Sequence, residues 1–397
     1  MAPDVTEKSS NRLAPLDGLR GIAIILVVLS HGWMLQWPLD EIFTNPWLKP
    51  WFKSGNSAVT IFLVASGFLT YRALARGGSL EGMRPGVTFL RRVLRVAPAV
   101  WVMMAVILLI ASIDPTDDYS QDTNRRNLVR VLTYTWNWFI HDSILDVRDD
   151  LGHLWYLSVD MQAFVLMSLL AWMLRRRPLG LPAALAGIWL VLAWWRTYIA
   201  DREDHLLALL RTTVRMDAFV IGMLAASLIP LAGQLRGHTR GLRIGTGVAF
   251  VPLIVWCDDN AAYLSLPGTL LQVNAALFLF ALVLSTDQPR RSLLALPGLV
   301  WLGRNSLALY IWHVPVIKFM VRHAGDWSWQ ARTAVALLVV VGICWLSDRL
   351  IDRKVSTLLA RPGWRRLDDG LVPALSSSVG GAWRSSRAPG APKRRRG

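Results

Sequence analysis

The chain has few cysteines and few lysines, and the shortage of cysteine excludes a class of protein. Its two cysteines, Cys257 and Cys344, lie far apart and outside any metal-ligand spacing, which excludes a disulfide framework and gives no support to a zinc site. Only six of the 43 basic residues are lysine, an arginine bias that is typical of GC-rich bacterial genomes. Between residues 16 and 355 there is no segment that reads as an appended soluble domain.

Hydrophobic residues instead make up 53% of the 397 residues. They fall in runs of about 18 or more, the length that an α-helix needs to cross roughly 30 Å of hydrocarbon. The net charge of +16 would suit a nucleic-acid-binding protein. The basic residues, however, lie in short connections between apolar runs and at the C-terminal end, where membrane topology explains them better. We therefore expect a membrane protein whose partner is the lipid bilayer, with no nucleic-acid partner.

Ten candidate spans follow from these runs. They cover residues 18–37, 56–72, 93–113, 153–174, 180–198, 213–231, 242–257, 265–285, 298–320 and 331–350. The connections after the even-numbered spans are rich in arginine, whereas those after the third and seventh spans are acidic. Because an excess of arginine and lysine marks the cytoplasmic side, the sequence predicts an all-α, polytopic transmembrane helix bundle with both termini in the cytoplasm.

Composition also divides the chain into three parts. We expect a polar N-terminal segment over residues 1–15 and a membrane domain over residues 16–355. Residues 356–397 are expected to form a basic, disordered cytoplasmic tail whose arginines meet anionic lipid. The longest connection, residues 114–152, should lie on the outer face. The predicted location is a bacterial plasma membrane, which the chain crosses many times.

Three spans carry a titratable group at similar depth, although such groups are costly inside a membrane. At 1.5 Å per residue, His31 lies roughly 16 Å along its helix from Arg20. His313 lies roughly 13 Å from the cytoplasmic edge of its span, and Asp160 roughly 10 Å from the outer edge. The similar depths predict one wet cavity inside the bundle. Structural alternatives stay open: an interhelical hydrogen bond for a histidine, and an ion pair with Arg215 for Asp160.

A second polar cluster is the segment "FLRRVLRVAP" at residues 89–98. Arg92 and Arg95 are three residues apart, so they share a helix face at the cytoplasmic end of the third span. Arginine forks bind phosphate in a bidentate manner, and with Arg20 they would form a cationic mouth beneath His31. The alternative is ordinary anchoring of the span by positive charge.

In this order, the segments resemble blocks of the membrane acyltransferase family known as acyltransferase 3, over about residues 14–355. The similar blocks read "LDGLRGIAIILVVLSHG", "AVTIFLVASGFLTYR", "RRVLRVAPAVW", "GHLWYLSVDMQAFV", "RMDAFVIGMLAA" and "LGRNSLALYIWHVPVI". Members of that family transfer acyl groups, usually acetyl, from acyl-coenzyme A to sugars of envelope glycans and to other hydroxyl-bearing molecules. The resemblance implies an O-acyltransferase in which His31, separated from Arg20 by ten residues, is catalytic.

The chain departs from the family's pattern in two ways. Where the family commonly has Glu-Glu-Gln after the tryptophan block, this chain has Asp160-Met161-Gln162, and the shorter carboxylate keeps the charge but changes its reach. The extracytoplasmic SGNH hydrolase-like domain that is fused to some members is absent, so we expect a stand-alone member. Delivery of a glycan would then depend on the membrane domain or on a partner.

The resemblance and the residues together predict a mechanism. Arg20, Arg92 and Arg95 hold the head of acyl-coenzyme A, with acetyl-coenzyme A as the expected donor, and the thioester enters the bundle. His31 acts as general base toward a hydroxyl of a carbohydrate or a glycosylated small molecule that approaches from outside. Asp160 orients the imidazole or stabilises its charged form. No metal is expected, because the histidines lack ligand spacing.

The residues leave several alternatives open. Transfer is either direct or by way of a covalent acyl-enzyme, and the acceptor, the acyl-chain length, the oligomeric state and the role of His313 are not fixed. The main rival is a proton-coupled exporter of an envelope glycan or small molecule, because intramembrane histidine and aspartate also form proton relays. The arginine cluster and the lack of an inverted repeat argue against it. A non-catalytic membrane scaffold is the third hypothesis.

Overall fold

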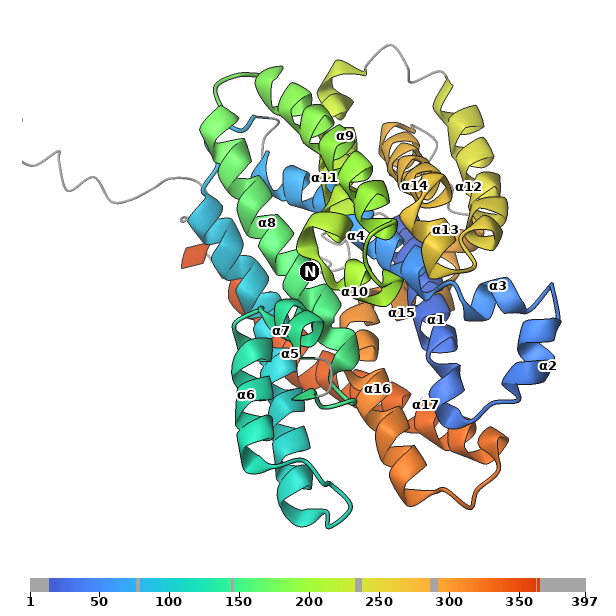
Figure 1. Ribbon diagram of the computed structural model, residues 1–397. Helices are drawn as coiled ribbons and strands as arrows, with labels where there is room; N and C mark the ends of the chain where they lie inside the picture. The colour runs from blue at the N-terminus through green and yellow to red at the C-terminus, as the bar shows by residue number, and fades with distance from the viewer. Residues whose placement is uncertain are drawn as a thin grey trace, which may run out of the picture.

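The fold is known from a computed structural model that describes residues 14–75, 79–143, 146–232, 238–285, 292–361 and 363–364. Within these residues every regular element is a helix, and no strand occurs, so the predicted all-α bundle is confirmed (Figure 1). The predicted segment 1–15 and the predicted tail 356–397 lie almost wholly outside the described residues. The last helix ends at Ala360, a few residues inside that tail.

Long helices build the body of the bundle. They are α1 (Ala14–Ser30), α4 (Gly55–Leu74), α5 (Pro85–Ile113), α8 (Trp155–Leu174), α9 (Gly180–Ala200), α11 (Thr212–Leu228), α12 (Thr239–Trp256), α14 (Leu266–Leu284), α16 (Ser306–His323) and α17 (Trp329–Ser347). Each predicted span overlaps one of them. In the described part of the chain, seven helical segments are long and apolar enough to cross a membrane. The chain is therefore a multi-pass membrane protein, and the count of ten spans stays a prediction.

Short helices connect the long ones. They are η2 (Gly32–Leu35), α2 (Leu39–Thr44), α3 (Lys49–Phe52), α6 (Gln121–Leu132), α7 (Trp136–Asp142), η5 (Gly152–Leu154), α10 (His205–Leu210), η6 (Ile229–Leu231), α13 (Asn260–Leu264), η8 (Leu293–Ala295), α15 (Pro297–Arg304), the π-helical turn η9 (Asp348–Asp352) and α18 (Arg353–Ala360). Two predicted spans are interrupted by such elements, and both interruptions have a local cause.

The first predicted span, 18–37, ends early as a regular helix. The hydroxyl of Ser30 and Nδ1 of His31 both donate to the carbonyl oxygen of Val27, at 2.7 and 2.8 Å. These side chains occupy an acceptor of the last turn, and the chain turns into η2 at Gly32. His31 therefore follows the last residue of α1. The predicted span 18–37 had placed it inside a continuous helix.

The ninth predicted span is two helices that meet at Asn305. The backbone N–H and the side-chain amide of Asn305 both donate to the carbonyl oxygen of Trp301, at 3.0 and 2.9 Å. This caps α15, and α16 starts in a new direction at Ser306. Hydropathy alone does not detect the break because both halves are apolar.

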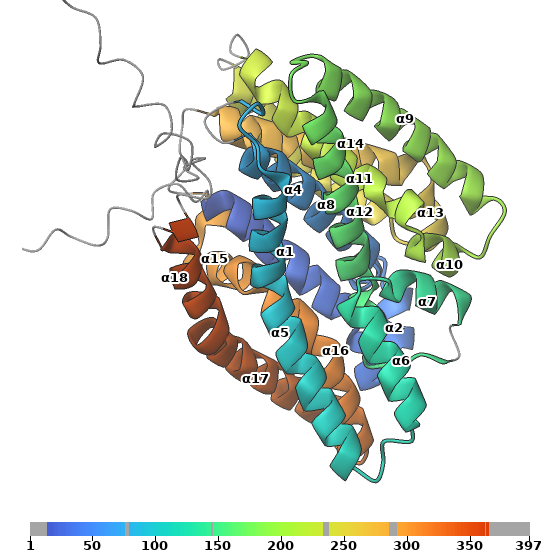
Figure 2. The ribbon, with the colours of Figure 1, turned by 90° about the vertical axis from the view of Figure 1, so that its left-hand side faces the viewer.

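The connections separate onto two ends of the bundle. At one end, Lys49 forms an ion pair with Asp258 at 2.7 Å, and the side chain of Asn56 donates to that of Asn260 at 2.7 Å. At the other end, the start of α1 contacts η8 and α15. Figure 2 shows α18 and the start of α1 together at the left, away from α2 and α6. The side of the membrane on which the chain ends lie stays a prediction of the charge alternation.

Glycines allow the closest helix crossings. A Cβ on Gly67 would lie 1.9 Å from the carbonyl oxygen of Phe219, and one on Gly222 would lie 2.0 Å from that of Val64. Helices α4 and α11 therefore pack backbone to backbone, as small residues permit in membranes. Gly303 does the same for α15 against α1, where a Cβ would lie 1.7 Å from the carbonyl oxygen of Asp17.

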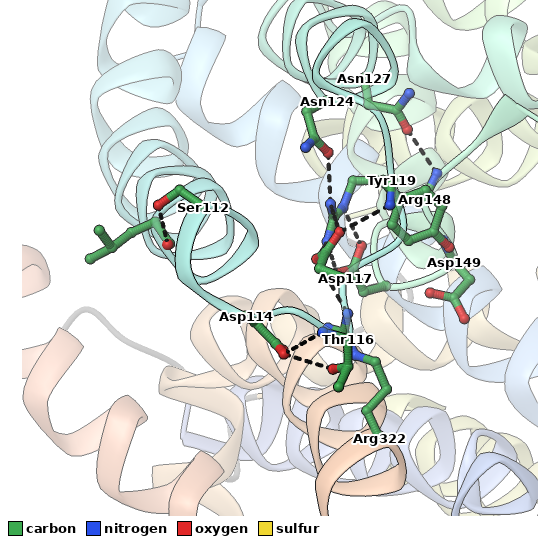
Figure 3. Close-up of polar contacts among 12 residues, drawn as sticks. Ser112, Asp114, Thr116, Asp117, Tyr119, Asn124, Asn127, Arg148, Asp149 and Arg322 are labelled. Atoms are coloured by element: carbon green, nitrogen blue, oxygen red, sulfur yellow. Dashed lines mark hydrogen bonds and ion pairs between the residues drawn. The ribbon is translucent and has the colours of Figure 1, made fainter.

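A buried arginine organises the long connection between α5 and α8 (Figure 3). Arg148 is 1% exposed and pairs with both carboxylate oxygens of Asp117, at 2.7 and 3.1 Å, and with Asp150 at 2.8 Å. It also donates to Asn124 at 2.7 Å, and Arg322 of α16 reaches the same Asp117 at 3.2 Å. The network fixes the connection onto α16, immediately before the segment that leads into α8.

We predict that Gly222→Ala lowers the thermal stability of the detergent-purified protein. Its Cβ would overlap a backbone carbonyl of α4, which cannot move aside as a flexible side chain would. Gly245→Ala on α12 is the matched control, because nothing lies within 4 Å of its Cβ and alanine favours helix by roughly 1 kcal/mol over glycine. Equal melting temperatures for the two variants would contradict the close packing of α4 and α11.

We also predict that Asp117→Asn destabilises the fold in a pH-dependent way. Burial raises the pKa of Asp117, but hydrogen bonds and charge from Arg148 and Arg322 outweigh it, so the pKa is below its ordinary value. A carboxylate with a lowered folded-state pKa stabilises the fold above its unfolded pKa of about 4, and this contribution is lost as the pH falls through the folded-state pKa. Breaking a buried ion pair costs about 3 kcal/mol.

Thermal unfolding of the wild type and Asp117→Asn should be compared between pH 7 and pH 3. The difference in melting temperature should be large at neutral pH and should shrink below about pH 4. A difference that does not change with pH would show that the side chain acts by packing alone.

Candidate functional site

A cavity of about 440 Å³ lies where the end of α1 meets the connections around α3 and α13. Its lining includes His31, His153 and Tyr310 together with the polar residues Lys53, Asn56, Asp258, Asp259 and Asn260. The cavity thus joins two groups that are far apart in the sequence. One group is His31 and His153, which lie at the ends of the long helices α1 and α8. The other is a set of hydrogen-bonding side chains from the connections at one end.

The ring of His31 has a defined tautomer. Its Nδ1 lies 2.8 Å from the carbonyl oxygen of Val27, which only accepts hydrogen bonds, so Nδ1 carries the proton. Nε2 then keeps its lone pair and is the ring nitrogen left for chemistry in the cavity. A neutral imidazole in this state can accept a proton.

His313 supports His31 from α16. Its Nδ1 lies 2.7 Å from the carbonyl oxygen of Tyr310 and 3.1 Å from that of Leu309, so this nitrogen is also protonated. Its Nε2 therefore accepts, and it lies 3.3 Å from Nδ1 of His31. The N–H of His31 is shared between a carbonyl oxygen and a second imidazole, which fixes the orientation of the ring.

His153 completes a cluster of three imidazoles. Its ring centroid lies 5.0 Å from that of His313, which in turn lies 5.0 Å from that of His31. Nε2 of His153 donates to the carbonyl oxygen of Ile311 at 3.1 Å. In the sequence, His153 is only the first residue of the predicted span 153–174. It lies in η5, before α8, whereas His31 and His313 belong to other spans, so no spacing within one helix relates it to them.

Asp160 does not contact His31 in this arrangement. Among the described residues, the hydrogen-bond partners of the His31 ring are Val27 and His313, whereas the carboxylate of Asp160 forms an ion pair with Arg92. The alternative pairing with Arg215 is not found either. Arg215 is fully buried and stacks on Trp155 and Tyr263, at 5.1 and 4.6 Å from the ring centroids.

Arg92 is held on several sides. It donates to the hydroxyl of Ser66 at 2.9 Å, and its guanidinium lies 4.6 Å from the ring centroid of Phe164. Its side chain is 18% exposed, and that of Asp160 is 12% exposed. Arg95, one turn further along α5, is exposed instead. The two arginines that were expected to act together therefore differ in environment.

Tyrosines connect the arginines with the histidines. The ring centroids of Tyr156 and Tyr310 are 5.3 Å apart, and Tyr310 lies 5.3 Å from His153. The Tyr156 phenol is within electrostatic range of Arg20, Arg92 and Asp160. Arg20 also donates to the hydroxyl of Ser306 at 2.9 Å. Of the residues predicted for donor binding, Arg20 and Arg92 thus lie near Tyr156, and the ring contacts of Tyr156 and Tyr310 continue to His153.

A larger cavity, of about 700 Å³, lies between α5, α7, α8 and α11 and contains none of the predicted site residues. Its polar lining is already hydrogen-bonded: Thr212 donates to Gln162, whose amide donates to the backbone of Tyr134 at 2.7 Å. We therefore place the candidate site in the smaller cavity. Among the described residues, no group of histidine, cysteine and acidic side chains is arranged to hold a metal ion.

Comparison with known proteins agrees with the resemblance. A model of the acyltransferase domain matches residues 13–349 of the chain. O-acetyltransferase OatA of Staphylococcus aureus strain NCTC 8325 is 22% identical over 328 residues, which cover 79% of this chain and 52% of OatA. A protein of S. aureus strain COL that is named as an O-acetyltransferase is 24% identical over 333 residues, with the same shares covered. The chain spans about half the length of these curated relatives. No solved structure matches it.

We predict that Asp160→Asn destabilises the protein more than Asp160→Glu does. The asparagine leaves the charge of Arg92 without its carboxylate, whereas glutamate keeps the ion pair at a different reach. The loss should be roughly 3 kcal/mol or less, because both side chains keep some exposure. Thermal unfolding in detergent measures the effect. Equal melting temperatures of the two variants would show that the ion pair between Asp160 and Arg92 contributes little to the stability of the fold.

Proposed function

Because the chain belongs to the acyltransferase family whose model spans residues 13–349, we propose that it is a membrane O-acyltransferase. It transfers an acyl group, acetyl in the first instance, from acyl-coenzyme A to a hydroxyl of a sugar or of a glycosylated small molecule. The bacterial relatives favour a bacterial plasma membrane as its location. The activity of the whole protein is inferred from relatives of which the chain covers about half.

The observation that carries the proposal is the free ring nitrogen of His31. Nδ1 is occupied by Val27 and His313, and the ring lines a cavity shared with Asn56, Asn260 and other polar side chains. A neutral imidazole with its lone pair in such a cavity is arranged as a general base for a hydroxyl compound. Its position at the end of α1 places it within reach of a ligand that enters between the connections.

We propose the following mechanism. Nε2 of His31 removes the proton of the acceptor hydroxyl while the oxygen attacks the thioester carbonyl. The new C–O bond forms, the C–S bond breaks, and the imidazolium returns the proton to the coenzyme A thiolate. The carbonyl of Val27 and Nε2 of His313 both accept from Nδ1–H, so both stabilise the imidazolium during transfer, the role that a carboxylate has in a catalytic triad.

The donor head binds at the opposite end. Arg20 and Arg95 supply guanidinium groups for the phosphates of coenzyme A, with Arg92 beside them. We propose that Asp160 positions Arg92 rather than His31, since those two side chains are paired. The thioester arm then passes along Tyr156 and Tyr310 toward His31. No step requires a metal ion.

The proposal is tested with purified protein, radiolabelled acetyl-coenzyme A and a panel of sugar glycosides. We expect label on the sugar, and we expect His31→Ala to lower kcat by at least about 100-fold, the usual range for a general base. Substantial turnover by a well-folded His31→Ala protein would exclude His31 as the base. Proton-dependent flux of a solute without transfer would favour the exporter instead.

Arg95→Ala is the contrasting variant in the same assay. It removes a charge from an exposed position on α5, so it should raise KM for acetyl-coenzyme A with little change in kcat. An unchanged KM for the donor would identify Arg95 as a topological anchor only.

A further inference from the structure

The proposed transfer step places a negative charge in the cavity. When the hydroxyl oxygen adds to the thioester, the carbonyl oxygen takes up an electron pair and becomes an oxyanion. Enzymes stabilise such an oxyanion with donors or positive charges that are fixed before the reaction starts. A fixed charge acts strongly inside a membrane bundle, because the dielectric constant there is low.

Arg215, on α11, is a buried cation without a counter-ion of its own. Its side chain is 0% exposed, and none of its three guanidinium nitrogens has a hydrogen-bond partner among the described residues. The carboxylate of Asp217 on the same helix pairs instead with Arg196, at 3.1 Å, and accepts from Gln272 at 2.8 Å. Two buried guanidinium groups thus share one carboxylate, and one positive charge is left over.

Two aromatic rings hold Arg215 in place. The guanidinium carbon lies 4.6 Å from the ring centroid of Tyr263 and 5.1 Å from that of Trp155. Tyr263 is itself fixed, because its hydroxyl accepts from Thr60 at 2.7 Å. These contacts compensate part of the cost of burying the charge, but they leave the N–H groups of Arg215 without acceptors. An intramembrane charge that is paired so poorly indicates a function.

Arg215 lies behind the wall of the candidate cavity. Trp155, on which it stacks, lines that cavity together with His31, and Trp155 is only partly buried. Tyr310, a second residue of the wall, is also within electrostatic range of Arg215. A sphere with the volume of this cavity is roughly 9 Å across, so a charge formed anywhere in it lies within the range over which a buried cation acts at low dielectric.

We propose that Arg215 stabilises the oxyanion of acyl transfer from behind the cavity wall. This inference rests on the proposed function and deepens it by adding a residue to its machinery. The charge of Arg215 lowers the energy of the oxyanion more than that of the neutral thioester, which is the condition for faster chemistry. Arg215 does not touch the substrate. It is therefore a positioning residue, which keeps a positive charge beside the cavity.

The electron balance of the step is complete with the groups already named. Nε2 of His31 takes the proton of the hydroxyl, the oxygen forms a bond to the carbonyl carbon, and the π electrons of the carbonyl move to its oxygen. When the carbonyl reforms, the C–S bond breaks and its electron pair leaves with sulfur. The imidazolium then protonates the thiolate, and Arg215 keeps its charge throughout.

Thermal unfolding in detergent compares the two buried arginines. Arg196→Met leaves Asp217 without its ion pair and the carbonyl oxygen of Tyr263 without a donor, so the melting temperature should fall by several degrees. Arg215→Met removes a charge without leaving a partner unpaired, and methionine packs well against aromatic rings. Its melting temperature should therefore equal or exceed that of the wild type. An equal fall for both variants, or a failure of Arg215→Met to fold, would show a structural role and overturn the inference.

Acetyl transfer from acetyl-coenzyme A to methyl β-D-glucopyranoside and related methyl glycosides tests the charge itself. Arg215→Met should lower kcat about tenfold or more. Both KM values should change less than about twofold, because a charge that acts on the oxyanion does not contribute to binding of the neutral ground state. Arg215→Lys keeps the charge without the planar guanidinium, so it should lose less than about threefold in kcat.

Three results in this assay would overturn the inference. They are wild-type kcat in a folded Arg215→Met protein, equal losses of kcat in the lysine and methionine variants, and losses that appear only in KM. No transfer by the wild type to any glycoside would instead refute the proposed function, and the inference with it.

Discussion

The hydrogen bond between Nδ1 of His31 and the carbonyl oxygen of Val27 is the interaction on which the site depends. It is made where α1 ends, and it sets the tautomer of the ring. His313 makes the same kind of contact to Leu309 inside the continuous helix α16, so two of the three rings are fixed by carbonyl oxygens of the preceding helical turn. The contact leaves the imidazole of His31 with one defined lone pair, on Nε2.

This arrangement is held by packing at a distance from the ring. Gly303 brings α15 against the backbone of α1, and the break at Asn305 then lets α16 take a separate direction, along which His313 reaches His31. On the other side, the network around Arg148 ties the connection between α5 and α8 to α16 just before His153. Three segments that are remote in sequence thus bring three imidazole rings together, two of which line the cavity.

Hydropathy and charge were enough to predict the all-α bundle, and the spacing to Arg20 together with the family resemblance was enough to select His31 as a candidate. The partner of Asp160 could not be obtained in this way. Counting residues gives the depth of a side chain along its helix but not the direction in which it points. Whether Asp160 pairs with His31, Arg215 or Arg92 depends on how α5, α8 and α11 are rotated about their axes. His153 was passed over for a similar reason, since its importance comes from a turn of 3-10 helix that aims the ring inward.

The charge of Asp160 and the ring of His31 are held apart in this structure. In the structure, the negative charge of Asp160 is instead paired with Arg92, and the contacts to Nδ1 of His31 are neutral acceptors. Neutral groups thus orient the ring, whereas the charged side chains of the same cavity, Lys53, Asp258 and Asp259, come from the connections. Asp258 is itself paired with Lys49 at 2.7 Å, so the charge at this wall of the cavity is partly balanced within the protein.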